Sequence, residues 1–153
     1  AFDRVIRGCA GNRGPEHPGT WIVPEMIAAY ERLHATGLAH SVEAWDGDTL
    51  AGGLYGVSLG GSFFGESMFT RVGNASKVAL VLLIESLRRD GFELIDCQVT
   101  TEHLVQFGAR EVPRTHFMKE LQHALKQPTR QGVWRFSEAG GIGVEPSRTG
   151  GGV

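Results

Sequence analysis

The sequence predicts a mixed α/β fold, of the α+β kind, in which an antiparallel meander is packed against helices. Strand-like runs are separated by two turn signals, Asp46-Gly47 and Gly60-Gly61. The segment that follows the last of these runs is apolar nearly all round and predicts a largely buried helix. We expect the strands at 40–45, 49–59 and 62–69, and the buried helix at about 75–89.

Further helices and a strand complete this pattern. Pro24 suits the first turn of a helix and Gly37 the position just past its end. Asn74 is the expected N-cap of the buried helix. Later elements are expected as a strand at 94–99, a short helix capped by Thr101 and ending at Gly108, a strand at 110–112 and a helix at 114–125. Helix, meander, buried helix, strand and helix is the order of an acyltransferase-like fold.

The length of 153 residues predicts a single folded domain. We expect it at 20–127. Residues 1–19 are rich in Gly, Pro and Arg and predict a loop, the trailing end of an upstream domain. Residues 128–153, above all those from Ser137 onward, have few large apolar side chains and predict a disordered tail.

Composition excludes several classes of function. Fifteen Lys and Arg against seventeen Asp and Glu give a net charge of −2, so bulk charge does not indicate a nucleic-acid binder. No apolar run reaches the roughly 18 residues of a membrane span. Two cysteines cannot form a disulfide scaffold. These features favour a cytoplasmic protein with neither membrane nor DNA among its partners.

Asp96 and Gln98 are the most informative polar residues. On a strand they share one face, with Cα atoms roughly 7 Å apart. They form either a structural hydrogen-bonded pair or a polar pair in a cleft that orients an amine and helps it to lose a proton. Cys97 between them points the other way and is expected to be a small core residue.

Two other segments are candidates for binding. Glu66 stands among aromatic residues, where burying an acid is costly without a cationic partner, so it is either salt-bridged or binds a cationic substrate group. The segment 71–77 places a glycine, Ser76 and Lys77 at a helix start, which could bind an anion or serve only as a cap. The histidines have no metal-ligand spacing, and no serine has the setting of a nucleophile elbow.

Six motifs in order resemble the C-terminal domain of the leucyl/phenylalanyl-tRNA–protein transferase family. The resemblance covers roughly residues 2–125. The motifs are Thr20-Trp21-Ile22, Ala39-His40-Ser41-Val42-Glu43 with Gly52-Gly53-Leu54-Tyr55-Gly56-Val57, Gly65-Glu66-Ser67-Met68-Phe69, Asn74-Ala75-Ser76-Lys77, Leu94-Ile95-Asp96-Cys97-Gln98, and LVQFGAREVP from Leu104 to Pro113.

The resemblance implies a GNAT-like fold and a definite reaction. Leu, Phe or Met would pass from its tRNA to a protein that begins with Arg or Lys, which marks that protein for N-degron proteolysis. It also implies that no metal or soluble cofactor takes part, because the tRNA ester is already activated.

The resemblance further implies roles for individual residues. Asp96 and Gln98 match the pair that promotes attack of the acceptor amine, and Glu66 matches an acid of the site. The substrate-binding positions are Trp21 at the aminoacyl-adenosine and Leu54, Phe63 and Ile95 around the Leu or Phe side chain. Charge alone adds Arg71, Lys77 and Arg114 as contacts for the tRNA acceptor end.

Family members also carry an upstream domain that nothing here matches. We therefore expect a part of a longer protein, with the activity belonging to the intact protein and weak or no tRNA binding by this chain alone. An acyl-CoA-dependent N-acetyltransferase and an inactive binding module are the alternative functions.

Overall fold

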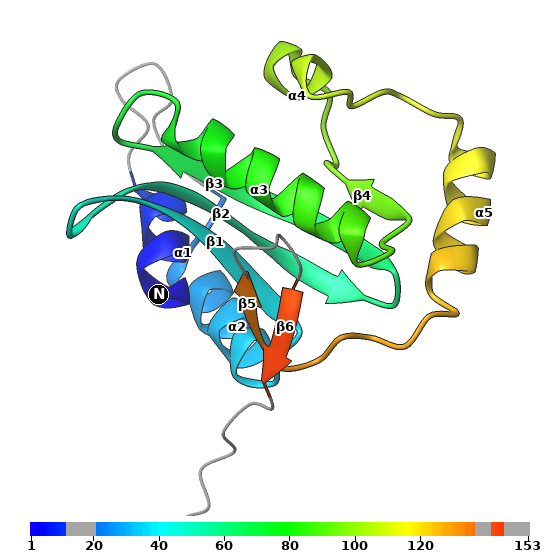
Figure 1. Ribbon diagram of the computed structural model, residues 1–153, viewed down its shortest axis with the longest axis horizontal. Helices are drawn as coiled ribbons and strands as arrows, with labels where there is room; N and C mark the ends of the chain where they lie inside the picture. Colours follow the sequence, from blue (N-terminus) through cyan, green and yellow to red (C-terminus); the bar gives the residue numbers. More distant parts are fainter. Residues whose placement is uncertain (12–20, 137–141, 146–153) are drawn as a thin grey trace, which may run out of the picture.

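The computed structural model describes residues 1–11, 21–136 and 142–145. Its centre is a four-stranded sheet in the order β1-β2-β3-β4 (Figure 1). The first three strands form the predicted antiparallel meander, and the fourth joins β3 in parallel. Their bounds are Ala39–Asp46 for β1, Thr49–Leu59 for β2, Ser62–Thr70 for β3 and Leu94–Asp96 for β4.

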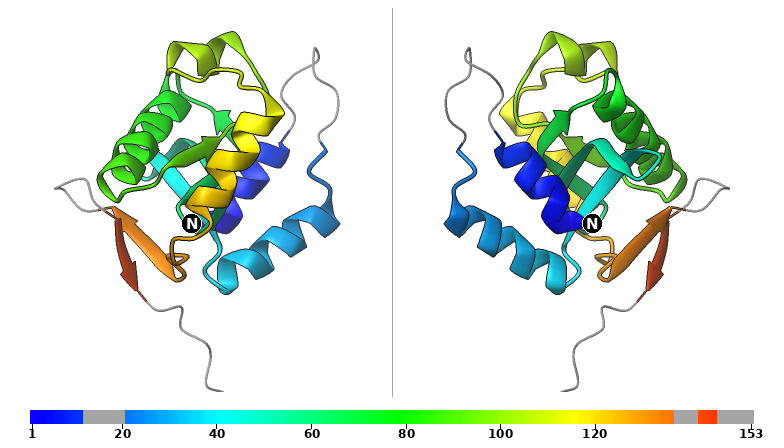
Figure 2. Two further views of the ribbon diagram at one scale, coloured as in Figure 1. Left: turned by 90° about the vertical axis from the view of Figure 1, so that its right-hand side faces the viewer. Right: turned by 90° about the vertical axis from the view of Figure 1, so that its left-hand side faces the viewer.

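Helices cover both faces of this sheet (Figure 2). The helix α3 (Ala75–Arg89) packs on one face, and α1 (Phe2–Ala10) and α2 (Pro24–Ala35) pack on the other. After β4 the chain forms a short helix, a longer helix and a two-stranded antiparallel sheet. These are α4 (Glu102–Gln106), α5 (Arg114–Ala124), β5 (Val133–Phe136) and β6 (Ile142–Glu145). In the described parts of the chain, no helix has the length and apolarity needed to cross a membrane.

The sheet separates two apolar clusters, so the mixed α+β architecture is confirmed. The cluster under α3 includes side chains from β1, β2, β3, α3 itself, α4 and the β5–β6 hairpin. Its fully or nearly buried members are Val42, Leu54, Phe63, Ala79, Leu80, Leu83, Leu87, Leu104, Trp134 and Ile142. The cluster under α1 and α2 contains Phe2, Val5, Ile6, Cys9, Ile22, Ala39, Leu50 and Tyr55.

The prediction of a loop at the start of the chain was wrong for residues 2–10, which form α1. The four apolar residues of that segment, Phe2, Val5, Ile6 and Cys9, recur at helical spacing and are all buried against the sheet. Burial of this stripe outweighs the local abundance of glycine and arginine. Residues 12–19 lie outside the described residues, and assignment of residues 1–19 to an upstream domain stays a prediction.

The predicted disordered tail contains a hairpin, which corrects that expectation for 133–136 and 142–145. Trp134 and Ile142 enter the core under α3. Asp90 anchors the hairpin, because its Oδ2 accepts the Ile142 N–H at 2.6 Å and its Oδ1 lies 3.2 Å from Arg130. Apolar burial therefore orders this segment despite its glycines; residues 137–141 and 146–153 of the predicted tail lie outside the described residues.

Three local expectations also need correction. The helix α3 is not buried all round, since Val78 is 62% exposed and Val81 and Leu82 also face solvent. Asn74 precedes α3 in a left-handed conformation (φ 67°), and its side chain makes no capping hydrogen bond. Residues 110–112 are irregular rather than a strand. The predicted cap of α4 is confirmed, because the Leu104 N–H donates to Thr101 Oγ1.

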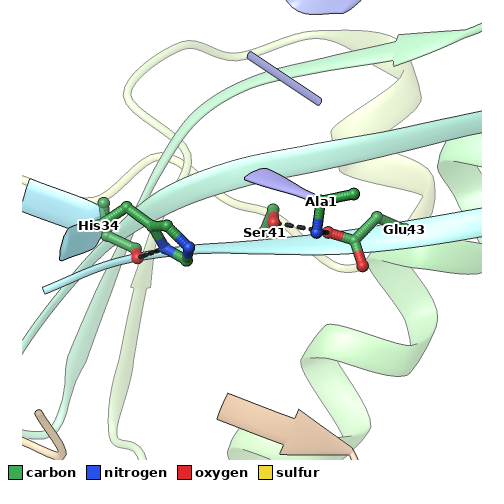
Figure 3. Close-up of polar contacts among 5 residues, drawn as sticks. Ala1, His34, Ser41 and Glu43 are labelled. Atoms are coloured by element: carbon green, nitrogen blue, oxygen red, sulfur yellow. Dashed lines mark hydrogen bonds and ion pairs between the residues drawn. The ribbon is translucent and has the colours of Figure 1, made fainter. Parts of the chain in front are cut away.

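Polar contacts join the N-terminal helices to β1 (Figure 3). Ser41 donates a hydrogen bond of 2.7 Å to Glu43 Oε1, and the α-amino group of Ala1 lies 3.4 Å from the same oxygen. The His34 ring, through Nδ1, donates to the Ala39 carbonyl at 2.8 Å. The start of α1 and the end of α2 are therefore both held against the same strand.

Gly56 allows β2 and β3 to pack closely, and its replacement tests that packing. A Cβ at Gly56 would collide with the Phe64 carbonyl oxygen and with the ring of Phe63. We expect Gly56→Ala to lower the free energy of unfolding by about 1–3 kcal/mol, because the backbone oxygen cannot move aside cheaply. Urea unfolding measures this loss. Gly73→Ala is the control, since its added Cβ meets open space, and an equal loss in both variants would contradict the prediction.

Candidate active site

An apolar cavity opens where two parallel strands separate. The pairing of β3 with β4 runs from Ser62↔Leu94 to Phe64↔Asp96 and stops there, while β3 continues to Thr70. The space between the separating chains is a cavity of about 280 Å³. Its lining comes from β2, β3, α3, the chain after β4, α4 and Trp21.

The family resemblance implies that Leu54, Phe63 and Ile95 surround one apolar side chain of the substrate, and all three line this cavity. Leu54 and Phe63 are 3% and 1% exposed, so they form its rigid floor. Trp21 lies at the edge of the cavity with half of its surface exposed. Further apolar lining residues, which sequence reasoning did not single out, are Met68, Leu80, Leu83 and Leu104. Leu80 and Leu83 could have been found from the buried stripe of α3.

Glu66 lines the same cavity, and its partner is a phenol rather than the expected cation. Tyr30 of α2 donates a hydrogen bond to the Glu66 carboxylate. Burial raises the pKa of Tyr30 above its usual value, and the hydrogen bond to and charge of Glu66 raise it further. The phenol therefore keeps its proton at any physiological pH and holds the carboxylate by a neutral donor. Tyr30 was missed because nothing in the sequence links α2 to β3.

The structure changes the expected geometry of Asp96 and Gln98. The strand β4 ends at Asp96, and Gln98 has a left-handed backbone (φ 61°), so the two side chains do not alternate along one strand face. Instead the backbone N–H of Gln98 donates to Asp96 Oδ1 at 2.8 Å. The carboxylate thus fixes the turn that carries Gln98. Gln98 lines both the cavity and a neighbouring groove, whereas Asp96 lines the groove alone.

Cys97 lies between these two residues and is half-buried, lining both the cavity and the groove. Burial raises the pKa of its thiol, and the Asp96 charge acts in the same direction. A protonated thiol is a poor nucleophile, which fits the expectation of a packing role. Within the described ranges, no three side chains among His, Cys, Asp and Glu gather into a possible metal site.

The three basic candidates lie apart from the cavity. Arg71 stands before α3, with its guanidinium 5.2 Å from the Phe69 ring centre, and Lys77 lies in the first turn of α3. Arg114 begins α5 and lines the groove. The structure brings together Trp21, Leu54, Phe63, Glu66, Ile95 and Gln98 at the cavity, with Asp96 next to it and these three cations elsewhere.

A mixed sheet whose parallel strands separate around an apolar cavity is consistent with an α+β, acyltransferase-like fold. Comparison with known proteins identifies the family. Residues 1–122 match the family model described as leucyl/phenylalanyl-tRNA protein transferase, and the chain belongs to this family.

Curated relatives agree with this assignment. A leucyl/phenylalanyl-tRNA–protein transferase of Anaeromyxobacter dehalogenans (strain 2CP-C) is 64% identical over 140 residues, which are 92% of this chain and 60% of that protein. Proteins of the same name from Nitratidesulfovibrio vulgaris (strain DP4) and Desulforapulum autotrophicum are 56% and 53% identical, over 90% of this chain and 59% and 60% of their own lengths. The chain spans about 60% of the length of these relatives.

Proposed function

We propose that this chain is the aminoacyl-transfer part of a leucyl/phenylalanyl-tRNA–protein transferase. The observation that carries the proposal is the gathering of the four expected substrate-binding residues, Trp21, Leu54, Phe63 and Ile95, around one cavity in a chain of this family. A cavity of about 280 Å³ has room for one large amino-acid side chain. Its apolar floor suits Leu, Phe or Met, with modest selectivity because one methylene is worth only about 1–3 kcal/mol.

The proposed reaction joins an amine to an ester carbonyl. The α-amine of an acceptor beginning with Arg or Lys attacks the carbonyl carbon of Leu-tRNA or Phe-tRNA. A C–N bond forms, the C–O bond to the terminal ribose breaks, and the amine proton passes to the leaving ribose oxygen. Asp96, held to Gln98 by the 2.8 Å hydrogen bond, would accept that proton on its way. Glu66 would place the reacting end, and Trp21 would contact the terminal adenosine.

The proposed product is a protein with a new N-terminal Leu or Phe, which would mark it for N-degron proteolysis in the cytoplasm. Arg71, Lys77 and Arg114 are proposed to contact the tRNA acceptor end, with the segment of the relatives that this chain does not match contributing the rest. Family membership favours transfer from tRNA over acetyl transfer from coenzyme A. The alternative of an inactive module is decided by the following experiment.

The test is transfer of labelled leucine from Leu-tRNA to a peptide that begins with Arg. We expect Asp96→Asn to reduce the rate ~100-fold or more, because it removes a proton acceptor while keeping the shape of the turn. Asp48→Asn, an exposed carboxylate in the β1–β2 turn, is the matched control. An Asp96→Asn variant that is as fast as the control would contradict the assignment.

Absence of transfer by the chain alone has a defined next step. The unmatched part of the Anaeromyxobacter dehalogenans relative is then added, and rescued transfer supports the proposal. No transfer in the mixture rejects it in favour of the inactive module.

A further inference from the structure

A second, larger hollow adjoins the cavity. The proposal above uses Asp96 and Arg114 from its lining but assigns no occupant to the hollow itself. It is a groove of about 930 Å³ between the C-terminal half of α3, β4 and the loop and helix at 107–117. Figures 1 and 2 place α5 on the outer side of β4, the last strand of the sheet. Apolar groove residues outside the cavity include Ile84, Phe92, Leu94, Val112 and Phe117.

The groove and the cavity are joined. Six residues line both, namely Leu80, Ile95, Cys97, Gln98, Val99 and Leu104. Asp96 lines the groove alone, so the carboxylate and the amide of the Asp96–Gln98 turn stand at the junction of the two hollows. A reaction at this turn can therefore draw one substrate from each side.

Charge narrows the choice of occupant. The groove is lined by four carboxylates, Glu93, Asp96, Glu111 and Glu120, against the guanidiniums of Arg88, Arg110 and Arg114. The carboxylates outnumber the guanidiniums, and one of them, Asp96, belongs to the turn at which the reaction is proposed. This excess of negative charge disfavours a polyanion such as single-stranded RNA. It suits a chain that enters with a cationic N-terminus and carries apolar side chains behind it.

We infer that this groove binds the first few residues of the acceptor polypeptide in an extended conformation, with its α-amine at the Asp96–Gln98 turn. The inference rests on the proposed function and adds to it a binding surface beyond the N-terminal residue. Its volume, about three times that of the cavity, gives room for several residues. The edge of β4 and the part of α5 that carries Arg114, Phe117 and Glu120 supply two walls for such a chain.

The experiment compares acceptors of different length. Transfer of leucine to an Arg-initiated dipeptide is measured beside transfer to a six-residue peptide with the same first two residues. We expect the longer peptide to have a KM lower by about tenfold at similar kcat. Phe117→Ala, which removes part of the α5 wall, should erase most of this gain and leave the dipeptide unaffected. Leu121→Ala, also half-buried on α5 but outside the groove, should retain the gain.

Each outcome decides a separate question. Equal KM values for the two peptides would overturn the groove inference, and so would a lower KM of the longer peptide that persists in Phe117→Ala. In both cases the observed transfer of leucine still supports the proposed function. If neither peptide is a substrate, even after the unmatched part of the Anaeromyxobacter dehalogenans relative is added, the proposed function fails. The groove is then judged by fluorescence anisotropy of the labelled six-residue peptide, which must bind the unaltered chain and lose affinity in Phe117→Ala. A single-stranded RNA ending in CCA whose binding weakens in Phe117→Ala, without a peptide effect, assigns the groove to RNA and overturns the inference.

Discussion

Replacing Trp134 by alanine is expected to lower the free energy of unfolding by ~3–5 kcal/mol, the cost of deleting a buried aromatic side chain. The indole is 9% exposed and stacks on the His40 ring with centroids 3.8 Å apart. Phe92 meets it edge-on at 5.7 Å, and its Nε1–H donates to the Arg130 carbonyl. The alanine variant loses all of these contacts, so urea unfolding followed by far-UV circular dichroism should shift to lower denaturant.

The matched control is Val133→Ala, because Val133 neighbours Trp134 on β5 and is 37% exposed. We expect a change of ~0.5 kcal/mol or less, as for surface substitutions. Comparable losses in both variants would mean that the β5–β6 hairpin does not contribute to the core.

Acidification is expected to destabilise the fold through His40. Burial, helped by the nearby His34, lowers the pKa of this histidine to about 3, although a hydrogen bond with the Gly37 backbone acts in the opposite direction. The ring is 3% exposed, and within the described part of the chain its Nε2 has no hydrogen-bond partner. A proton on this ring would be a buried charge without compensation.

The sign of the effect follows from the direction of the pKa shift. Above pH 6.5 the ring is neutral in both the folded and the unfolded chain, so the stability of the fold is complete there. As the pH falls from 6.5 toward 3, only the unfolded chain takes up the proton, and the free energy of unfolding decreases. Between pH 6.5 and 4.5 the loss should be about 2–3 kcal/mol, at ~1.4 kcal/mol per pH unit. Urea midpoints measured across this range report it.

His40→Phe keeps a ring against Trp134 and removes the titrating group, so its stability should fall less steeply with pH over that range. His116→Ala is the control, because His116 is exposed on α5. The prediction fails if the His40→Phe slope equals that of the unaltered chain.

Much of the fold could be predicted because local signals and burial agree. Asp46-Gly47 and Gly60-Gly61 each fall between strands, and Gly47 and Gly60 have positive φ values as such turns require. The elements that escaped prediction depend on distant partners. The apolar residues of α1 recur at helical spacing, but the glycine and arginine among them favour a loop, and burial of Val5 and Ile6 against the sheet decides for the helix. Trp134 likewise orders its hairpin through contacts with residues far away in the sequence.

The candidate site, like the fold, was predicted only in part. Leu54, Phe63 and Ile95 are pocket residues only by the family resemblance, not by any local pattern, and the structure places them around one cavity. The Asp96–Gln98 geometry could not be foreseen, because alternation along a strand assumes extended backbone and Gln98 is left-handed. Tyr30 reaches Glu66 from another layer of the fold, a relation that no spacing encodes. The catalytic roles themselves stay predictions.

The place of Trp134 in the core has a consequence for biosynthesis. Val42 and Trp134 belong to one cluster although about ninety residues separate them. A ribosome that has released only the meander and α3 has therefore produced a sheet whose α3 face is still incompletely covered. Closing this long loop comes late and is slow, since distant contacts must overcome chain entropy before they stabilise anything. Nascent chains arrested before Trp134 should bind chaperones at this face, whereas release of β6 should end that binding.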